Sequence, residues 1–249
     1  SIERGLDATG LYSPLNGLNR SLSQGWSVAT SATTNLKEDN LIIAHVRAKT
    51  VGVSSIANTH PFRRGNYILA HNGTLRNYGA LKAKYDIVDP TAVVDSDIVT
   101  ACMEKSDNFD VLKQLDGAAA LLITDKRTPN TLYVFRKGAK AEADIRPLFK
   151  GNINGNMYIS SIAEALLLIG CNNVKEFKFD TLYTIENGLI VKTKSIKNTP
   201  YAEPVTIASY GSNNDPNPLI KAVGGWLRSR TDHTIYCKTG LNYKFQKGV

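Results

Sequence analysis

The sequence predicts an α+β fold in which β-sheets stack face to face and helices cover the outside. Apolar runs of strand length and stretches of helical spacing come in blocks: sheet, two or three helices, sheet, helix, sheet. The chain has 249 residues, of which 42% are hydrophobic and 21% charged. This length fits one large domain, or a domain with an appendage.

Two buried strands are expected in the first third of the chain. Residues 1–10 are polar and contain glycine, which indicates a loop, and residues 11–34 indicate short strands and loops. Residues 41–48 and 66–71 are apolar runs with the length of a buried strand. Polar residues follow both runs, so candidate functional groups are expected at the two strand ends.

Helices are expected after the second strand. Apolar side chains there recur at the interval that places them on one face of a helix: Leu75, Tyr78, Leu81 and Tyr85. Asp95 or Ser96 can cap a second helix that runs to about Lys105. Residues 108–115 are expected to form a short third helix.

Hairpins are expected in the second half. The predicted elements are strands at 118–124 and 131–136, a strand at 157–161, a helix at 163–170, and strands at 181–186 and 189–193. Asn187-Gly188, between the last two strands, is the pair of residues that a tight type I′ turn favours.

The composition changes at about residue 195, where Asn, Pro, Gly and Lys become frequent. We therefore expect a domain at 1–194 and a basic extension at 195–249 that packs on the domain or on a partner. Residues 212–218 are typical of a linker.

The composition argues against several classes of function. The net charge of +8 permits contact with polyanions, but no basic run or binding motif accompanies it, so nucleic-acid binding is not expected. No apolar run reaches the ~18 residues of a membrane helix, and no signal peptide is visible. The three cysteines form neither a disulfide framework nor a zinc pattern, which favours a reducing, cytoplasmic location.

Polar motifs follow the two apolar runs. The first run ends in Arg47-x-x-Thr50-x-Gly52 and the second in His71-Asn72-Gly73. The two strand ends would thus place a cation, an amide and a flexible backbone near one another. Such groups suit a pocket that binds a small zwitterion and polarises its carbonyl group.

The full set of motifs resembles the class II glutamine amidotransferases. In chain order the motifs are Arg4-Gly5-x-Asp7-x-Thr9-Gly10, Ala44-His45-x-Arg47-x-x-Thr50-x-Gly52, Asn58-x-His60-Pro61, His71-Asn72-Gly73-x-x-x-Asn77, Ser96-Asp97 and Leu115-Asp116-Gly117. The resemblance covers roughly residues 3–194. It implies the four-layer α/β/β/α sandwich of the N-terminal-nucleophile hydrolases, which agrees with the block order.

The resemblance also implies an activity and roles for individual residues. The side-chain amide of glutamine would be hydrolysed to glutamate and ammonia without a cofactor or metal, and the ammonia would pass to a separate acceptor or synthase subunit. The Asn72 amide and the Gly73 N–H would stabilise the oxyanion. Arg47 would hold the α-carboxylate of glutamine and Asp97 its α-ammonium, while Thr50 and His60 would line the pocket.

Each role has a structural alternative. Asn72-Gly73 can be a simple turn, Asp97 a helix-start residue, and Arg47 part of a surface ion pair. The histidines at 45, 60 and 71 do not have the spacing of metal ligands, so we expect hydrogen-bonded structural histidines.

The nucleophile is the main departure from the family pattern. By resemblance it is an N-terminal cysteine in a strand about two dozen residues before Arg4, whereas this sequence starts at Ser1. Three explanations are open. An upstream segment carries the cysteine, or the protein is a non-catalytic structural or interaction protein with the same fold. The third and least expected is that Ser1 is the nucleophile. Whether the chain is an enzyme and whether it forms a homo-oligomer are left open.

Overall fold

The structure is a computed structural model that describes residues 8–22, 36, 39–47, 55–138 and 144–196, and the backbone of 234–239. The expectations for the loop at 1–7, for the linker at 212–218 and for Thr50 lie outside the described residues. No helix in the described ranges is long and apolar enough to cross a membrane.

A seven-stranded antiparallel sheet contains the first predicted strand. Its strand order is β10-β8-β9-β13-β3-β1-β2. The strands are β1 (Ala8–Ser13), β2 (Gly17–Ser21), β3 (Leu41–Arg47), β8 (Phe149–Ile153), β9 (Asn156–Ser160), β10 (Asn172–Glu176) and β13 (Thr234–Thr239). Residues 234–239 thus lie inside the sheet, between β3 and β9, although they belong to the sequence stretch expected to be an extension.

A six-stranded antiparallel sheet contains the second predicted strand. Its strand order is β12-β11-β7-β6-β5-β4. The strands are β4 (Phe62–Arg64), β5 (Tyr67–Leu75), β6 (Gly117–Asp125), β7 (Thr131–Arg136), β11 (Thr181–Glu186) and β12 (Leu189–Ser195).

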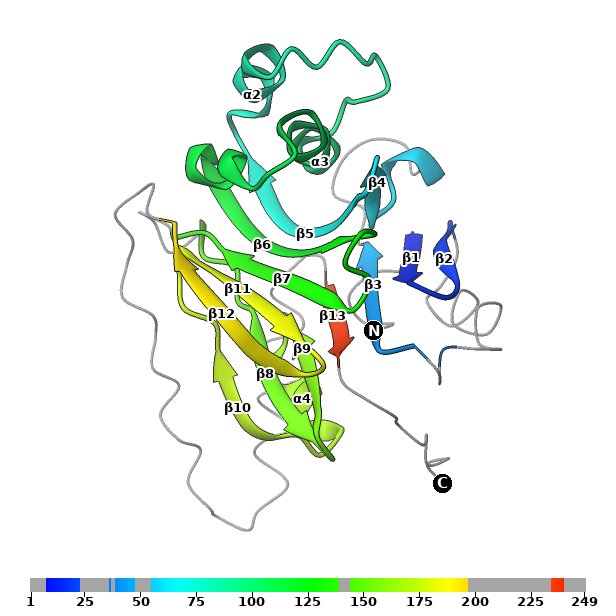
Figure 1. Ribbon diagram of the computed structural model, residues 1–249, viewed down its shortest axis with the longest axis vertical. Coiled ribbons are helices and arrows are strands. Elements are labelled where there is room, and N and C mark those ends of the chain that lie inside the picture. Colours follow the sequence, from blue (N-terminus) through cyan, green and yellow to red (C-terminus); the bar gives the residue numbers. More distant parts are fainter. Residues whose placement is uncertain are drawn as a thin grey trace.

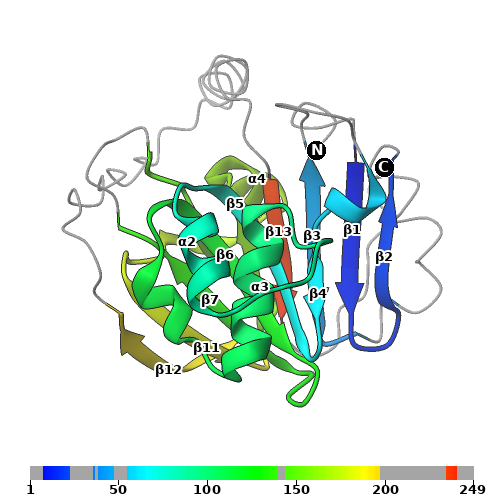
Figure 2. The ribbon, with the colours of Figure 1, turned by 90° about the horizontal axis from the view of Figure 1, so that it is seen from above.

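Helices cover the outer faces of the two sheets. On the six-stranded sheet, α2 (Tyr78–Lys84) and α3 (Asp95–Ser106) lie over β5 and β6, and the 3₁₀-helix η2 (Asp110–Gln114) follows (Figures 1 and 2). On the seven-stranded sheet, α4 (Ala163–Leu168) packs against β8, β9 and β10. A second 3₁₀-helix, η1 (Ile56–Asn58), precedes β4.

Side-chain alternation along the strands produces two main cores. Leu69, Leu121 and Phe135 face α3 and η2, and all three are fully buried. Ala70, Leu122 and Val134, which are their immediate neighbours in the same strands, face the other sheet, because successive side chains of a strand point to opposite faces. Helix, sheet, sheet and helix therefore stack as the predicted α/β/β/α sandwich.

Most of the predicted elements are confirmed. They include β3, α2, α3, the hairpin of β6 and β7, β9, α4, and the hairpin of β11 and β12. Asn187 and Gly188 both have positive φ, 49° and 77°, as a type I′ turn requires.

Several boundaries were predicted wrongly. Residues 8–10, expected in a loop, belong to β1, because pairing with both β2 and β3 outweighs their weak strand pattern. The second strand continues beyond residue 71 to Leu75, since it pairs along its whole length with β6, all of whose residues are buried. The third helix is a 3₁₀-helix, Val94 occupies the N-cap of α3, and the edge strand β10 was not foreseen.

Candidate functional site

Asn72 lies inside β5 and its side chain faces the seven-stranded sheet. It pairs with Ala120 of β6 and shares a face with Ala70, which belongs to the core between the sheets. The Asn72 side chain is 1% exposed, and its Oδ1 has no hydrogen-bond partner among the described residues. A buried amide without a complete set of partners is costly to keep, which makes it a candidate for ligand contact.

Gly73 has a backbone conformation that side chains rarely adopt. Its φ is 144°, and a Cβ at this position would lie 2.0 Å from the carbonyl oxygen of Ala118 on β6. The strand can therefore pass this point only with glycine. This contradicts the alternative in which Asn72-Gly73 is a simple turn, because both residues are paired within the sheet.

A serine joins the two histidines next to this strand. The Ser96 hydroxyl lies 2.9 Å from Nε2 of His60 and 2.8 Å from Nδ1 of His71. Nε2 of His71 lies 3.2 Å from the carbonyl oxygen of Ala118 and donates to it, which leaves Nδ1 to accept from Ser96. Burial lowers the pKa of His71, and the nearby Asp95 carboxylate opposes this effect. The contacts confirm the expectation of hydrogen-bonded structural histidines for His60 and His71.

Helix α3 brings Ser96 to the histidines. Asp95, in its first turn, accepts hydrogen bonds from the backbone N–H of Ser96 at 2.7 Å and from that of Leu75 at 2.8 Å. The second bond ties the start of α3 to the end of β5. A carboxylate in the first turn is also favoured by the helix dipole.

Arg47 ends β3 on the face that looks toward the six-stranded sheet. Leu41 and Ile43, three and two alternations earlier, lie in the core between the sheets, so the same face of β3 carries Arg47. Its Nη1 donates to the carbonyl oxygen of Asn58 at 3.2 Å. This bond connects Arg47 to the segment that carries His60, and no ion pair of Arg47 is formed with another described residue.

Asp97 is paired with an arginine that the sequence did not single out. Arg64 of β4 donates from Nε to Oδ1 at 2.7 Å and from Nη2 to Oδ2 at 2.5 Å. Arg64 also pairs with Asp89, and both carboxylates raise its pKa. The side chain of Asp97 is only 8% exposed. A paired Arg at the end of an edge strand has no distinctive sequence pattern, which explains why it was missed.

Arg20 of β2 is a further cation near Asp97. Its Nη1 donates to the carbonyl oxygen of Ile56 at 3.2 Å, and its guanidinium lies 5.8 Å from the centre of the Phe62 ring. Burial lowers the pKa of Arg20, and the charge of Asp97 opposes that shift. Arg20 and Arg64 are thus two cations near Asp97 that the sequence motifs did not indicate.

The structure thus links the described candidate residues through contacts. Ser96 connects His60 to β5, which carries Asn72 and Gly73, and Asp97 follows Ser96 in the chain. Thr50 lies outside the described residues. Among those that are described, no group of three His, Cys, Asp or Glu side chains could hold a metal ion.

The chain is similar to a known protein family and to known proteins. The family described as "Glutamine amidotransferase domain" matches residues 30–208, more than two-thirds of the chain. A glutamine–fructose-6-phosphate aminotransferase of Rhizobium leguminosarum is 30% identical over 274 residues, covering 96% of this chain and 43% of that protein. An amidophosphoribosyltransferase of Methanocaldococcus jannaschii is 27% identical over 226 residues, covering 82% and 46% respectively. The chain spans less than half the length of these relatives.

Solved structures share the fold. The glutamine phosphoribosylpyrophosphate amidotransferase of B. subtilis superposes with a TM-score of 0.63 at 20% identity, over 79% of this chain and 44% of that one. A structure described as the allosteric regulatory enzyme of purine biosynthesis gives a TM-score of 0.65 at 21% identity, with the same coverage. The chain therefore belongs to the class II glutamine amidotransferase domain family and has the N-terminal-nucleophile hydrolase fold.

Proposed function

We propose that this domain binds glutamine between the two sheets and releases its side-chain amide as ammonia for a separate acceptor. The observation that carries the proposal is the pair of donors on β5. Asn72, whose side-chain Nδ2 is a donor, is 1% exposed on the face of β5 toward the other sheet, and the neighbouring Gly73 has a backbone conformation that favours glycine. In the proposed reaction, these two residues donate hydrogen bonds to the oxyanion that forms when the amide carbonyl is attacked.

The charged groups nearby suit the two ends of an amino acid. Arg47 would form a forked contact with the α-carboxylate, which lysine cannot reproduce. Asp97 would accept from the α-ammonium. Its two bonds to Arg64 use two of the roughly four acceptor positions of a carboxylate, so capacity for a ligand ammonium remains. Thr50 and His60 would complete the pocket wall.

Neither described cysteine can supply the attacking thiolate. Cys102 belongs to α3 and is fully buried in the core, and burial raises the pKa of its thiol to about 11. Cys171 is 6% exposed beside α4, and burial raises its pKa as well. In the proposed reaction, the nucleophile is therefore the N-terminal cysteine that the family resemblance implies. The rival hypothesis is a non-catalytic protein that keeps the fold.

Glutamine binding tests the pocket independently of the chemistry. Titration calorimetry of the protein with Arg47→Lys should give a Kd for glutamine raised by at least about tenfold, because the forked hydrogen bonds are lost although the charge is kept. Arg63→Lys is the matched control, since Arg63 is exposed on β4 and, among the described residues, its side chain bonds only to the backbone of Gly65. Equal binding by the Arg47 variant and the wild type would refute the pocket assignment.

Turnover tests the chemistry. We expect the protein with its native N-terminus to hydrolyse glutamine, and Asn72→Ala to lower kcat by about 10²–10³-fold with a small change in glutamine affinity. A diazoketone analogue of glutamine should add one mass increment to the N-terminal peptide of the wild type. Glutamine binding without turnover or labelling would exclude the amidase reaction and favour the non-catalytic alternative.

A further inference from the structure

A second cavity lies on the opposite face of the six-stranded sheet from Asn72. It has a volume of about 370 Å³ and opens between η2 and the strands β7, β11 and β12. The nearest strand that lines it, β7, is two strands away from β5, which at ~5 Å per strand, together with the opposite face, separates the cavity from the candidate glutamine site. Its size falls within the range of small-molecule pockets, about 300–1,000 Å³.

A bulge in β12 aims two lysines into this cavity. Ile190 pairs with Ile185 and packs in the core between the sheets, whereas the next pair is Lys192 with Thr184. Val191 is the extra residue. A bulge of this kind changes the face to which the following side chains point. Lys192 and Lys194 therefore face the helical side of the sheet and line the cavity.

The floor of the cavity is aromatic and aliphatic. The rings of Phe109 and Tyr133 lie 4.7 Å apart between centroids, tilted by 51°. Leu182 and Ile196 belong to the adjoining core and complete the apolar surface. Helices α2 and α3 lie over β5 and β6, so they leave this end of the sheet uncovered (Figure 2).

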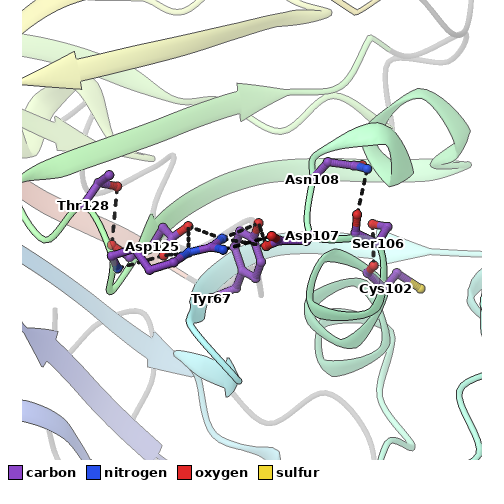
Figure 3. A network of polar contacts seen from close by, with 8 residues as sticks. Tyr67, Cys102, Ser106, Asp107, Asn108, Asp125 and Thr128 are labelled. Carbon is purple, nitrogen blue, oxygen red and sulfur yellow. Dashed lines mark hydrogen bonds and ion pairs between the residues drawn. The ribbon is translucent and has the colours of Figure 1, made fainter.

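The wall of the cavity is held in place by polar contacts. Arg127 donates to Asp107 at 2.6 and 3.0 Å, and the hydroxyl of Tyr67 donates to the same carboxylate at 3.0 Å. Asn108 donates to the carbonyl oxygen of Ser106 at 2.9 Å (Figure 3). These bonds fix the segment that leads from α3 into η2, so the cavity wall is ordered before any ligand binds.

The charge of the cavity is positive. Lys113 pairs with Asp110 at 2.5 Å, which leaves Lys192 and Lys194 without an ion pair to any other described residue. The two lysines lie two residues apart on one face of β12, so both can contact a single anion in the cavity.

We propose that this cavity binds a small phosphomonoester attached to a planar ring, for which a nucleoside monophosphate is the model. The phosphate contacts Lys192 and Lys194, and the ring packs on Phe109 and Tyr133. The amide of Asn108 and the hydroxyl of Thr184 line the same cavity and supply hydrogen bonds to the ring or the sugar. This inference does not depend on the glutamine site.

Ligand fragments test which parts of the ligand are recognised. In NMR titrations of the ¹⁵N-labelled protein, AMP should shift resonances of β12 and of the segment around Phe109. Adenosine lacks the charge and ribose 5-phosphate lacks the ring, so each should bind at least about tenfold more weakly than AMP. AMP binding should also weaken as salt is added. The absence of AMP binding up to about 10 mM, or shifts confined to other elements, would refute the proposal.

Charge variants test the site itself. Lys192→Ala combined with Lys194→Ala should raise the Kd for AMP by at least about tenfold, because two charge-assisted contacts are lost. Lys84→Ala combined with Lys126→Ala removes the same charge from exposed positions outside the cavity and should leave the Kd within about twofold. All four lysines are exposed, and urea unfolding will verify that both variants remain folded. Equal loss of AMP binding in the two double variants would show a non-specific charge effect and overturn the site.

Discussion

Replacement of Gly73 by alanine should destabilise the protein strongly. At φ 144° a residue with a side chain is strained by about 1–3 kcal/mol. The added Cβ would also lie 2.0 Å from the Ala118 carbonyl oxygen, and relief of such overpacking costs about another 1–3 kcal/mol. The free energy of unfolding should therefore fall by about 2–6 kcal/mol. For a domain of this size, that corresponds to roughly 2–4 °C in Tm for each kcal/mol.

Gly79→Ala is the matched control for this experiment. Gly79 lies in α2, is exposed, and has no atom within 4 Å of an added Cβ. Alanine there should stabilise the helix by about 1 kcal/mol. In urea unfolding followed by circular dichroism, the midpoint should therefore fall for Gly73→Ala and rise for Gly79→Ala. A Gly73→Ala protein with the midpoint of the wild type would refute the claim that β5 needs glycine at this point.

Three further outcomes follow from buried groups. Burial lowers the pKa of His71 below the ~6.5 that it has in the unfolded chain. The neutral, buried His71 therefore contributes fully to the free energy of unfolding above about pH 6.5. Below that pH, the free energy of unfolding falls by up to ~1.4 kcal/mol per pH unit, because the unfolded chain binds the proton more readily. Urea midpoints at descending pH should fall less steeply for His71→Gln, and an unchanged slope would contradict this assignment. Leu121→Ala should lower the free energy of unfolding by about 2–5 kcal/mol with an unchanged m-value, whereas Leu168→Ala, at an exposed site, should change it by less than about 0.5 kcal/mol. Cys102 should resist alkylation until the protein unfolds, because its thiol is buried and its pKa is raised to about 11; rapid labelling in native buffer would contradict this.

The fold could be predicted because its strands and helices carry strong periodic patterns. The apolar run of β3, the helical spacing of α2 and the Asn187-Gly188 turn each depend on local chemistry, and the structure confirms all three. The edge strand β10 was missed because its residues are mostly exposed and polar. Its pairing with β8 comes from the tertiary structure rather than from its own sequence.

The candidate site was predictable only in part for a similar reason. Motif order singled out Asn72, Gly73 and Arg47 as candidates, since each stands in a short local sequence pattern. The pairing of Arg64 with Asp97 joins residues of an edge strand and a helix that are far apart in the chain. Such a pair is created by the packing of α3 beside β4, which no local pattern encodes.

The position of β13 has a consequence for how the protein folds. Residues 234–239 pair with residues 41–46 on one side and 157–160 on the other, so two early strands meet only when a late segment arrives. Pairings between such distant parts of a chain form slowly, and the edges of β3 and β9 stay open until then. During synthesis on the ribosome, the six-stranded sheet can assemble first, whereas the seven-stranded sheet is complete only after residues 234–239 have been synthesised. Nascent chains halted before residue 234 should therefore depend on chaperones to keep these edges from aggregating.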